Sequence, residues 1–470
     1  MRLWLKLALV AGMTLAILVP LMLIRAVIHE RQQYRAEAVT SVAATVGGAQ
    51  TIAGPVLRIP YTFMAESQVE NKDGSVRTVR ERTGSTLVVF PETLTAKGVM
   101  KPETRRRGLH EVRVFEWQGE VAATFNVELP SSSDPAADIQ IGTPVLVYGI
   151  SDVRGVRGTP VLRVGGQDVA LQQGGGTDGV TGMHAELAAP APGSTLQLDA
   201  RLTMTLSGTE TLSFLPVGQR NDIALQSDWP HPQFQGLSAS HDITAGGFEA
   251  NWQINALATT AQQRWKNGNW SAGAGGSGDY QPQPADAIGD ARDMAQVSLM
   301  DPVNTYVNAD RATKYGILFV LLTFIGFFMF ELVKQIRVHP IQYLLVGLAI
   351  AIFFLLLVSL SEHIPFARAY GAAALACIGL ITFYLSAVLG SAVRAAGFGA
   401  MLVTLYAALY GLLIMEDNAL VVGAGLLFVI LAGIMIVTRR MDWYALSGAG
   451  PRKPPPLRPQ PAVEDAAIIP

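Results

Sequence analysis

The sequence predicts an α+β membrane protein: six transmembrane helices, with a large antiparallel, sandwich-like β-rich domain inserted after the first helix, outside the cytoplasm. Two observations support this prediction. Hydrophobic residues make up 50% of the 470 residues and charged residues only 15%, and the apolar runs approach the roughly 20 residues that a helix needs to cross a bilayer. Between the first and second runs, apolar and polar residues alternate with a period of two, which is typical of half-buried strands.

The first apolar run covers residues 3–28. A cleaved signal peptide is the alternative, because it also combines a basic start with an apolar centre. This run is longer than the usual core of a signal peptide, and basic residues follow it rather than a small-x-small cleavage site. We therefore predict an uncleaved anchor over residues 1–30, in which Pro20 is tolerated as a kink.

Residues 31–311 are predicted to form the β-rich domain. Its clearest strand is residues 195–206, and residues 121–129 and 248–255 repeat the same alternation. Because each strand has one polar face, we expect mostly antiparallel sheets packed as a sandwich or an open barrel. Shorter strands are expected at residues 86–90, 112–117, 145–148 and 223–225, and the glycine-rich stretches 174–176 and 271–279 are expected to be loops.

Five more apolar runs predict a five-helix bundle within residues 312–440. They cover residues 316–330, 341–360, 369–389, 398–415 and 419–437. A short basic loop separates the first two, which together predict a helical hairpin. Residues 441–470 are rich in proline and basic residues, so we expect a disordered cytoplasmic tail there.

Positive charge predicts the orientation. Six spans place both termini on one side, and the basic residues of the later loops fall on that side: Lys334, Arg337, Arg394, Arg439 and Arg440. Cytoplasmic loops are enriched in such residues, so we expect cytoplasmic termini and a periplasmic β domain. Three arginines after the first span disagree: Arg25, Arg31 and Arg35. Long domains translocate largely regardless of charge, so the shorter loops decide.

Several functional classes find no support. The net charge of −2 and the lack of a basic patch interleaved with aromatic residues give no reason to expect nucleic acid as a partner. The single cysteine, Cys377, lies in an apolar run and excludes an intramolecular disulfide. The seven histidines are never paired at metal-ligand spacing, and no phosphate loop or nucleophile elbow occurs. We expect no catalytic residue, no metal and no cofactor.

One candidate binding segment comprises Asp228, Trp229, His231 and Phe234. Two prolines restrict the backbone around His231, so the imidazole and the two aromatic rings would form a recognition surface. The alternative is a rigid connection whose aromatic rings pack against the edge of a sheet.

A second candidate group lies at the ends of predicted spans: Arg311, Lys314, Glu362 and His363. At one membrane level, these residues would form an ion-paired collar that couples the β domain to the bundle. The alternative is that they reach water at the interface and cap helices. All ionisable groups of the spans, Glu331 included, are expected near span ends, which argues against a transporter.

Several motifs resemble those of one family. They are D-R-A-T-K-Y-G from Asp310, H-P-I-Q-Y-L-L-V-G from His339, L-S-E-H ending at His363, G-P-V-L-x-I-P at residues 54–60 and S-D-W-P-H-P-x-F at residues 227–234. Together they resemble the CreD family of bacterial inner-membrane, cell-envelope integrity proteins. The resemblance covers nearly the whole chain and implies a multi-pass inner-membrane protein involved in envelope integrity and in the envelope-stress and β-lactam response, without enzymatic activity.

Our first hypothesis is therefore a non-enzymatic envelope protein, embedded in the lipid bilayer, whose periplasmic β domain binds an envelope protein or glycan. Two alternatives stay open. A transporter or lipid-handling protein would require a water-accessible cavity among the spans. An enzyme acting on cell-wall glycans would require paired carboxylates that face one cleft.

Overall fold

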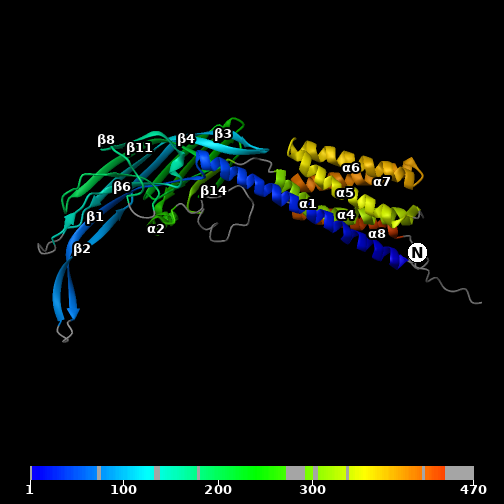
Figure 1. Ribbon diagram of the computed structural model, residues 1–470, viewed down its shortest axis with the longest axis horizontal. Helices are drawn as coiled ribbons and strands as arrows, with labels where there is room; N and C mark the ends of the chain where they lie inside the picture. The colour runs from blue at the N-terminus through cyan, green and yellow to red at the C-terminus, as the bar shows by residue number, and fades with distance from the viewer. Residues whose placement is uncertain are drawn as a thin grey trace, which may run out of the picture. The chain divides into compact units, whose positions relative to one another are not determined.

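The computed structural model describes residues 3–70, 76–131, 138–176, 180–270, 292–299, 305–334, 338–414 and 419–439. These residues form two compact units. The helical unit consists of the described parts of Met1–His29 and Thr305–Pro470, and the β unit of those of Glu30–Asn304 (Figure 1). The predicted loop 271–279, the predicted tail 441–470 and Arg337 lie outside the described residues.

The first helix, α1, covers Leu3–Val46 and belongs to both units. The β-rich domain was predicted to begin at residue 31, and its first 16 residues, 31–46, continue this helix. Residues 31–46 contain neither glycine nor proline, so nothing in them interrupts the helical backbone. The helix ends before Gly47, whose φ of +112° is a conformation that favours glycine. Pro20 lies inside the helix, as predicted.

Five further long helices belong to the helical unit. They are α4 (Thr305–Lys334), α5 (Pro340–Ser361), α6 (Phe366–Val388), α7 (Ala392–Ile414) and α8 (Ala419–Thr438). Among the described residues, five helices are long and apolar enough to cross a membrane, namely α1 and α4 to α7. In α8 the qualifying apolar stretch is only Gly423–Gly433, so a sixth span stays a prediction.

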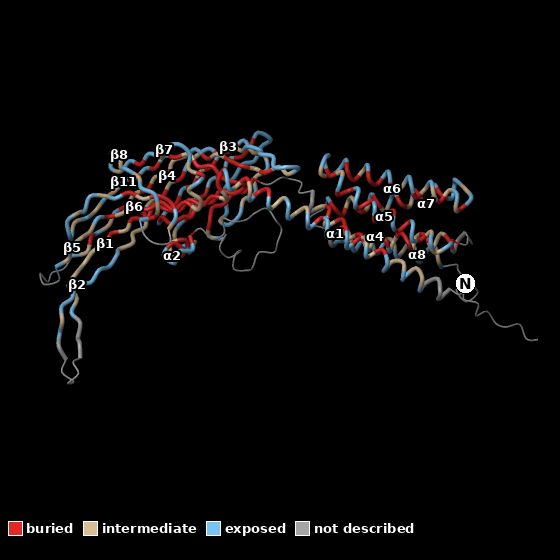
Figure 2. The backbone as a smooth tube through the Cα atoms, viewed as in Figure 1, coloured by how far each residue is buried: buried red, intermediate tan, exposed pale blue. Residues whose placement is uncertain are grey.

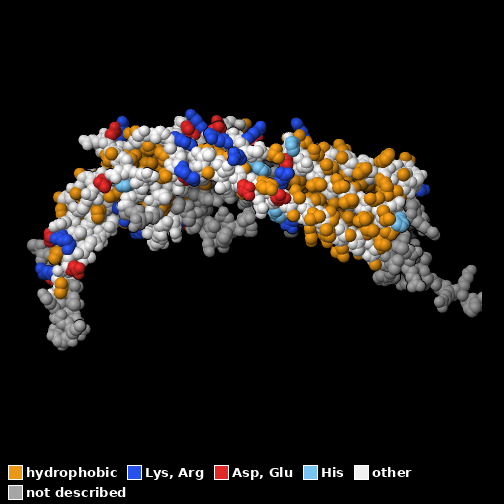
Figure 3. All heavy atoms as spheres, viewed as in Figure 1, with side chains coloured by type: hydrophobic (Ala, Val, Ile, Leu, Met, Phe, Trp, Pro, Cys, Tyr) orange, Lys and Arg blue, Asp and Glu red, His pale blue; other side chains and the backbone are white. Residues whose placement is uncertain are grey.

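The predicted helical hairpin is formed by α4 and α5. His339 caps α5: its side chain accepts a hydrogen bond from the Ile341 amide (3.3 Å), and the Gln342 side chain accepts one from the His339 amide (3.0 Å). Pro340 occupies the first helical position, where a backbone N–H would have no acceptor within the helix, so its absence costs no hydrogen bond. Figure 3 shows apolar side chains crowding the visible surface of the helical unit, as contact with lipid requires.

The β unit contains two sheets. The nine-stranded sheet has the order β14-β17-β12-β1-β6-β10-β9, with β2 and β5 paired to β1, and the eight-stranded sheet has the order β15-β16-β13-β3-β4-β11-β7-β8. The first sheet comprises β1 (Gln50–Glu70), β2 (Val76–Val89), β5 (Gln140–Ile141), β6 (Val145–Ile150), β9 (Gln172–Gln173), β10 (Gly182–Glu186), β12 (Thr211–Leu215), β14 (Pro232–Gly236) and β17 (Ala295–Leu299).

The second sheet comprises β3 (Thr93–Arg107), β4 (His110–Glu128), β7 (Val156–Val164), β8 (Gln167–Val169), β11 (Thr195–Thr209), β13 (Arg220–Ser227), β15 (Ser240–Thr244) and β16 (Gly247–Asn255). Short helices follow β6 and β16: η2 (Val153–Gly155), η3 (Ala256–Ala258) and α2 (Ala261–Lys266). Figure 2 shows the buried residues gathered inside the β unit, where both sheets contribute to one hydrophobic core.

Most strand pairs are antiparallel, as predicted, but the sheets are mixed. The pairs β1 with β12 and β3 with β13 are parallel, while every other pairing among the described strands is antiparallel. Gln50 pairs with Leu212 and Thr93 with Arg220, so long crossovers rather than tight hairpins join these strands. A crossover allows parallel pairing, and the alternation of residues along one strand cannot reveal it.

The predicted faces of the strands are confirmed. Along β11, Ala200, Leu202, Met204 and Leu206 are buried, whereas the polar residues between them are exposed or half-buried. The two strands predicted at residues 112–117 and 121–129 are one long strand, β4, because Gly119 continues the pairing with β3 and β11 without a break.

The second half of α1 packs against β4. Its Ala38, Val39, Val42 and Val46 form a small buried cluster with Val112 and Val114. Nearby, the Arg35 guanidinium pairs with the Glu210 carboxylate at 3.3 Å. The helix thus serves as part of the β unit, and not only as an anchor.

Asp152 fixes the junction between α1 and the first strand. Its carboxylate accepts hydrogen bonds from the backbone amides of Gly48 (2.9 Å) and Arg154 (3.1 Å). The Arg154 guanidinium donates to the same carboxylate, and this bond, together with the two amides, lowers the pKa of Asp152.

We expect Asp152→Ala to lower the free energy of unfolding of the β unit by about 1 kcal/mol at neutral pH. A carboxylate with a lowered folded-state pKa stabilises the fold above its unfolded pKa of about 4 and loses that contribution as the pH falls through the folded value. The difference between parent and variant should therefore shrink in acid, as urea unfolding at two pH values would show. Asp168→Ala, which removes the partner of Arg163 in an exposed pair, is the control, and an equal loss there would contradict the prediction.

Candidate functional site

The predicted recognition segment begins directly after β13 and extends into β14. The indole N–H of Trp229 donates to the carbonyl oxygen of His231 (2.9 Å), and their rings meet edge to face with centroids 6.2 Å apart. The Arg113 guanidinium lies 5.0 Å from the centroid of the Trp229 ring, a cation–π distance. Asp228 and His231 are exposed and Trp229 is half-buried. Trp229, His231 and Arg113 form what we call the Trp229 surface.

Phe234 has a different role. Its ring packs against Phe248 and Trp252, at centroid distances of 5.5 and 5.9 Å, and against His241 at 4.7 Å. Phe234 and the half-buried Trp229 both pack against the core of the β unit, as the alternative expected, whereas His231 is exposed. The sequence could not indicate Arg113 and His241, because β4 and β15 bring them from distant positions.

One residue of the predicted collar, Lys314, forms an ion pair with a residue outside the collar. The Lys314 ammonium binds the Asp310 carboxylate at 2.8 Å, one helical turn away, and the Arg25 guanidinium binds the same carboxylate at 3.2 Å. Asp310 thus joins α4 to α1 within the helical unit. His363 contacts the carbonyl oxygen of Ser359 at 3.2 Å. Arg311 and Glu362 are both half-buried, and an ion pair that joins them stays a prediction.

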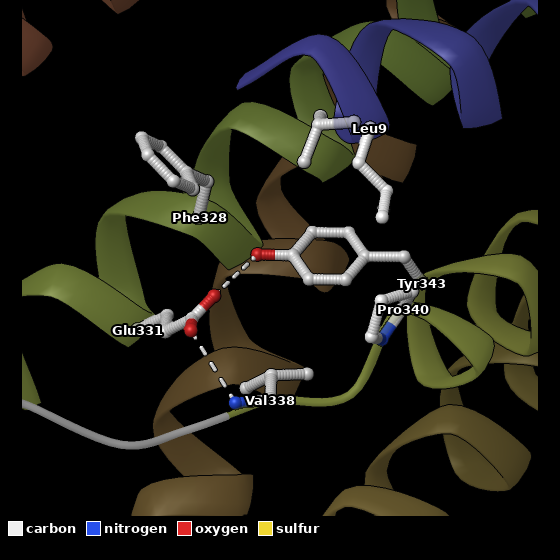
Figure 4. A pocket seen from close by; sticks show the side chains of 7 residues that line it. Leu9, Phe328, Glu331, Val338, Pro340 and Tyr343 are labelled. Carbon is white, nitrogen blue, oxygen red and sulfur yellow. Dashed lines mark hydrogen bonds between the residues drawn. The ribbon is translucent and has the colours of Figure 1, made fainter. Parts of the chain in front are cut away.

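A buried carboxyl group in the helical unit was not anticipated. Glu331 of α4 is only 4% exposed. One of its carboxyl oxygens accepts a hydrogen bond from the Tyr343 hydroxyl (2.9 Å) and the other from the Val338 amide (3.3 Å) (Figure 4). The Tyr343 ring is held by Phe324 and Phe327, at centroid distances of 5.7 and 4.7 Å.

A small hollow adjoins this pair. It is lined by Leu9, Val10, Phe328, Glu331, Val338, Pro340 and Tyr343. It has room for about one water molecule, so it admits no solute in this conformation. The sequence indicated that Glu331 lies near the end of a span. Its burial arises because the start of α5 and the first turns of α1 close over it, which hydropathy cannot show.

A second polar chain crosses the bundle. The Tyr370 hydroxyl donates to the carbonyl oxygen of Tyr406 (2.7 Å), the Tyr406 hydroxyl to the Cys377 sulfur (3.0 Å), and the Cys377 thiol to the carbonyl oxygen of Ala349 (3.3 Å). These bonds join α5, α6 and α7. Cys377 is buried among these helices. Within the described part of the chain, no group of three or more His, Cys, Asp or Glu residues is arranged to hold a metal ion.

Comparison with known proteins gives a consistent result. The family model described as Inner membrane protein CreD matches residues 2–444. The Inner membrane protein CreD of Escherichia coli (strain K12) is 35% identical to this chain over 439 residues, which is 93% of this chain and 92% of that protein. Both matches include the helical unit and the β unit.

Proposed function

The chain belongs to the CreD family of inner membrane proteins, and from this premise we propose that it supports cell-envelope integrity and the envelope-stress and β-lactam response without catalysing a reaction. The architecture supports this proposal. The β unit has a hydrophobic core of its own, drawn from both sheets, and the helical unit carries the candidate spans. Such a protein can present a folded binding domain at the membrane surface.

We further propose that both termini are cytoplasmic and that the β unit is periplasmic. The support is the distribution of lysine and arginine among the short loops after α4, since cytoplasmic loops are enriched in these residues. A periplasmic β unit would face the cell wall and the proteins that maintain it.

The Trp229 surface is proposed to bind an envelope protein or glycan. The observation that carries this proposal is a half-buried indole ring that contacts both a guanidinium and an exposed imidazole. Tryptophan and arginine are enriched among the residues that dominate binding energies at interfaces. An exposed His231 adds a hydrogen-bonding group that either kind of partner can use.

We expect a photo-crosslinking probe at position 231 to capture one defined envelope protein or glycan in intact cells. Trp229→Ala should lower the yield of that adduct about fivefold, the ratio that follows from losing about 1 kcal/mol of binding free energy. A probe at Gln167, an exposed residue of β8, is the matched control. Equal yields of the adduct from both positions, or a yield that Trp229→Ala leaves unchanged, would refute the proposal.

A second function is favoured by one observation. Ionisable groups buried among transmembrane helices commonly mark transport paths or proton relays, and Glu331 is such a group. We therefore keep a transporter or lipid-handling protein as the alternative function, in which Glu331 would take part in moving a proton or solute.

A further inference from the structure

The hairpin of β3 and β4 ends in a cluster of basic residues. Gly108 makes the turn with a φ of +61°, and the next residue, Leu109, is a large apolar side chain that is 60% exposed. Between positions 101 and 113 there are five basic residues against two acidic ones. The basic residues are Lys101, Arg105, Arg106, Arg107 and Arg113.

The acidic residues neutralise only part of this charge. Glu111 pairs with Arg106 at 2.7 Å and with Arg113 at 3.5 Å, and Glu103 lies 3.7 Å from Arg105. Arg107 is exposed and has no ion pair among the described residues. A folded hairpin that carries unneutralised arginine beside an exposed leucine favours a partner that is both anionic and apolar.

The contacts of β11 show which way the hairpin points. Thr209 pairs with Val114 of β4, and its hydroxyl donates to the carbonyl oxygen of Gly47 (2.7 Å), just past the end of α1. The next residue, Glu210, donates its amide to the Arg113 carbonyl oxygen (3.0 Å), and its carboxylate pairs with Arg35. From Val114 toward the turn, β4 therefore runs back along the second half of α1, from Val46 toward Arg35.

The level of the turn follows from these contacts. The strand from Val114 to Gly108 spans about 20 Å at about 3.3 Å per residue. The same length corresponds to about 13 helical residues, at about 1.5 Å each. Counted back from Gly47, the turn reaches the level of residues 31–35 of α1. Arg31 follows the apolar run of α1, which ends at Ile28, by three residues of the same helix.

Arg31 and Arg35 face the same space. They continue the helical spacing of the α1 residues that pack on β4, namely Ala38, Val42 and Val46. On the hairpin, Arg105 pairs with Val112 and Arg107 with His110, and directly paired residues point to the same side of the sheet. Because Val112 packs against α1, Arg105 and Arg107 point toward the α1 side as well.

We propose that Arg31, Arg105 and Arg107, with Leu109, form a binding site for the phosphate head groups of anionic lipids in the leaflet on the side of the β unit. Guanidinium groups bind phosphate in a bidentate manner, and Leu109 inserts between the head groups. The site gives a role to Arg31, one of the three arginines after the first span that the positive-inside rule leaves unexplained. This lipid site goes beyond the proposed function, because it needs no envelope protein or glycan as a partner.

The test places a fluorophore on Leu109→Cys in the full chain, reconstituted in nanodiscs of phosphatidylcholine alone or with an equal share of phosphatidylglycerol. The parent chain, whose only cysteine is the buried Cys377, provides the labelling blank. Lipids with a spin label on the head group then quench fluorophores at the membrane surface. We expect quenching to be about twofold greater in the anionic discs and to fall when added salt screens the charges.

Arg105→Gln combined with Arg107→Gln should reduce quenching in anionic discs to the value in neutral discs. Arg163→Gln combined with Arg201→Gln, which removes two arginines from exposed strand pairs elsewhere in the β unit, is the charge-matched control and should leave quenching unchanged. A label on Gln167→Cys, near the opposite end of β11 from Thr209, should be quenched weakly. Equal quenching of the label at position 109 in both lipids, or quenching as weak as at position 167, would overturn the proposal.

Discussion

Trp117→Ala is expected to lower the free energy of unfolding of the β unit by about 3 to 5 kcal/mol, the usual range for removing a buried large aromatic side chain. Trp117 is fully buried in the core between the sheets. Its ring meets Phe214 of the other sheet edge to face, with centroids 5.6 Å apart. The cavity left by alanine would therefore open where the two sheets meet.

A pair of glycines makes room for the ring. Gly98 of β3 and Gly119 of β4 lie directly opposite each other. A Cβ atom at Gly98 would come within 2.4 Å of the Trp117 indole nitrogen, and one at Gly119 within 2.2 Å of a ring carbon. We therefore expect Gly119→Ala to destabilise the β unit by about 1 to 3 kcal/mol through overpacking.

Two controls distinguish ring packing from other effects. Gly84 is also a strand glycine, but a Cβ there would meet nothing within 4 Å, so Gly84→Ala should leave stability nearly unchanged. The Trp117 indole nitrogen has no hydrogen-bond partner among the described residues, so Trp117→Phe should lose ring contacts alone and destabilise less than alanine. Urea unfolding of the full chain in detergent, followed by near-ultraviolet circular dichroism, measures these differences. Similar losses for Gly119→Ala and Gly84→Ala would contradict this account.

Tyr343→Phe is expected to destabilise the helical unit by about 2 to 3 kcal/mol, because a buried carboxyl group loses a hydrogen-bond donor. The Tyr343 hydroxyl is 2.9 Å from Glu331, and both side chains are nearly inaccessible to solvent. The change leaves the ring and its contacts with Phe324 and Phe327 in place. Unfolding of the full chain in mixed detergent micelles measures the loss.

A double-mutant cycle isolates the pair. If the hydrogen bond causes the effect, Tyr343→Phe should lower the free energy of unfolding only slightly further when Glu331→Leu is already present. The coupling free energy between the two positions would then exceed about 0.5 kcal/mol. Tyr410→Phe is the control, since the described residues show no hydrogen bond to that hydroxyl and its ring packs on Tyr370. Additive losses would show that Tyr343 acts by packing alone. Glu331→Gln in proteoliposomes addresses the alternative function, which predicts that this change abolishes a proton or solute flux.

The strands were predictable where one face is polar. The alternation along β11 identified both the strand and its buried face, because a period of two fixes which side chains point to the core. Hydropathy likewise located the α4–α5 hairpin, with His339 and Pro340 marking the start of α5. These features depend on residues close together in the chain.

The features that could not be predicted depend on residues far apart in the chain. Residues 31–46 are too polar for a span, and the sequence places them in the β-rich domain without indicating a helix there. The packing of Val42 and Val46 on β4 stabilises them as a helix. Glu331 was placed near a span end but not in a buried pair, because Val338 and Tyr343 approach it only after the chain turns back. Trp229 was identified, whereas Arg113 beside it was not.

The order of strands in the first sheet has a consequence for synthesis at the ribosome. β17 lies between β14 and β12, and β12 lies between β17 and β1, the first strand of the chain. The sheet that starts at Gln50 is therefore complete only after Leu299 has been made, a few residues before α4 begins. Until β12 is made, β1 keeps a free edge, and from then until β17 is made the free edge is that of β12. Non-local pairing of this kind is slow and exposed to aggregation. A chaperone that binds unpaired strands would protect that edge until the last strand arrives.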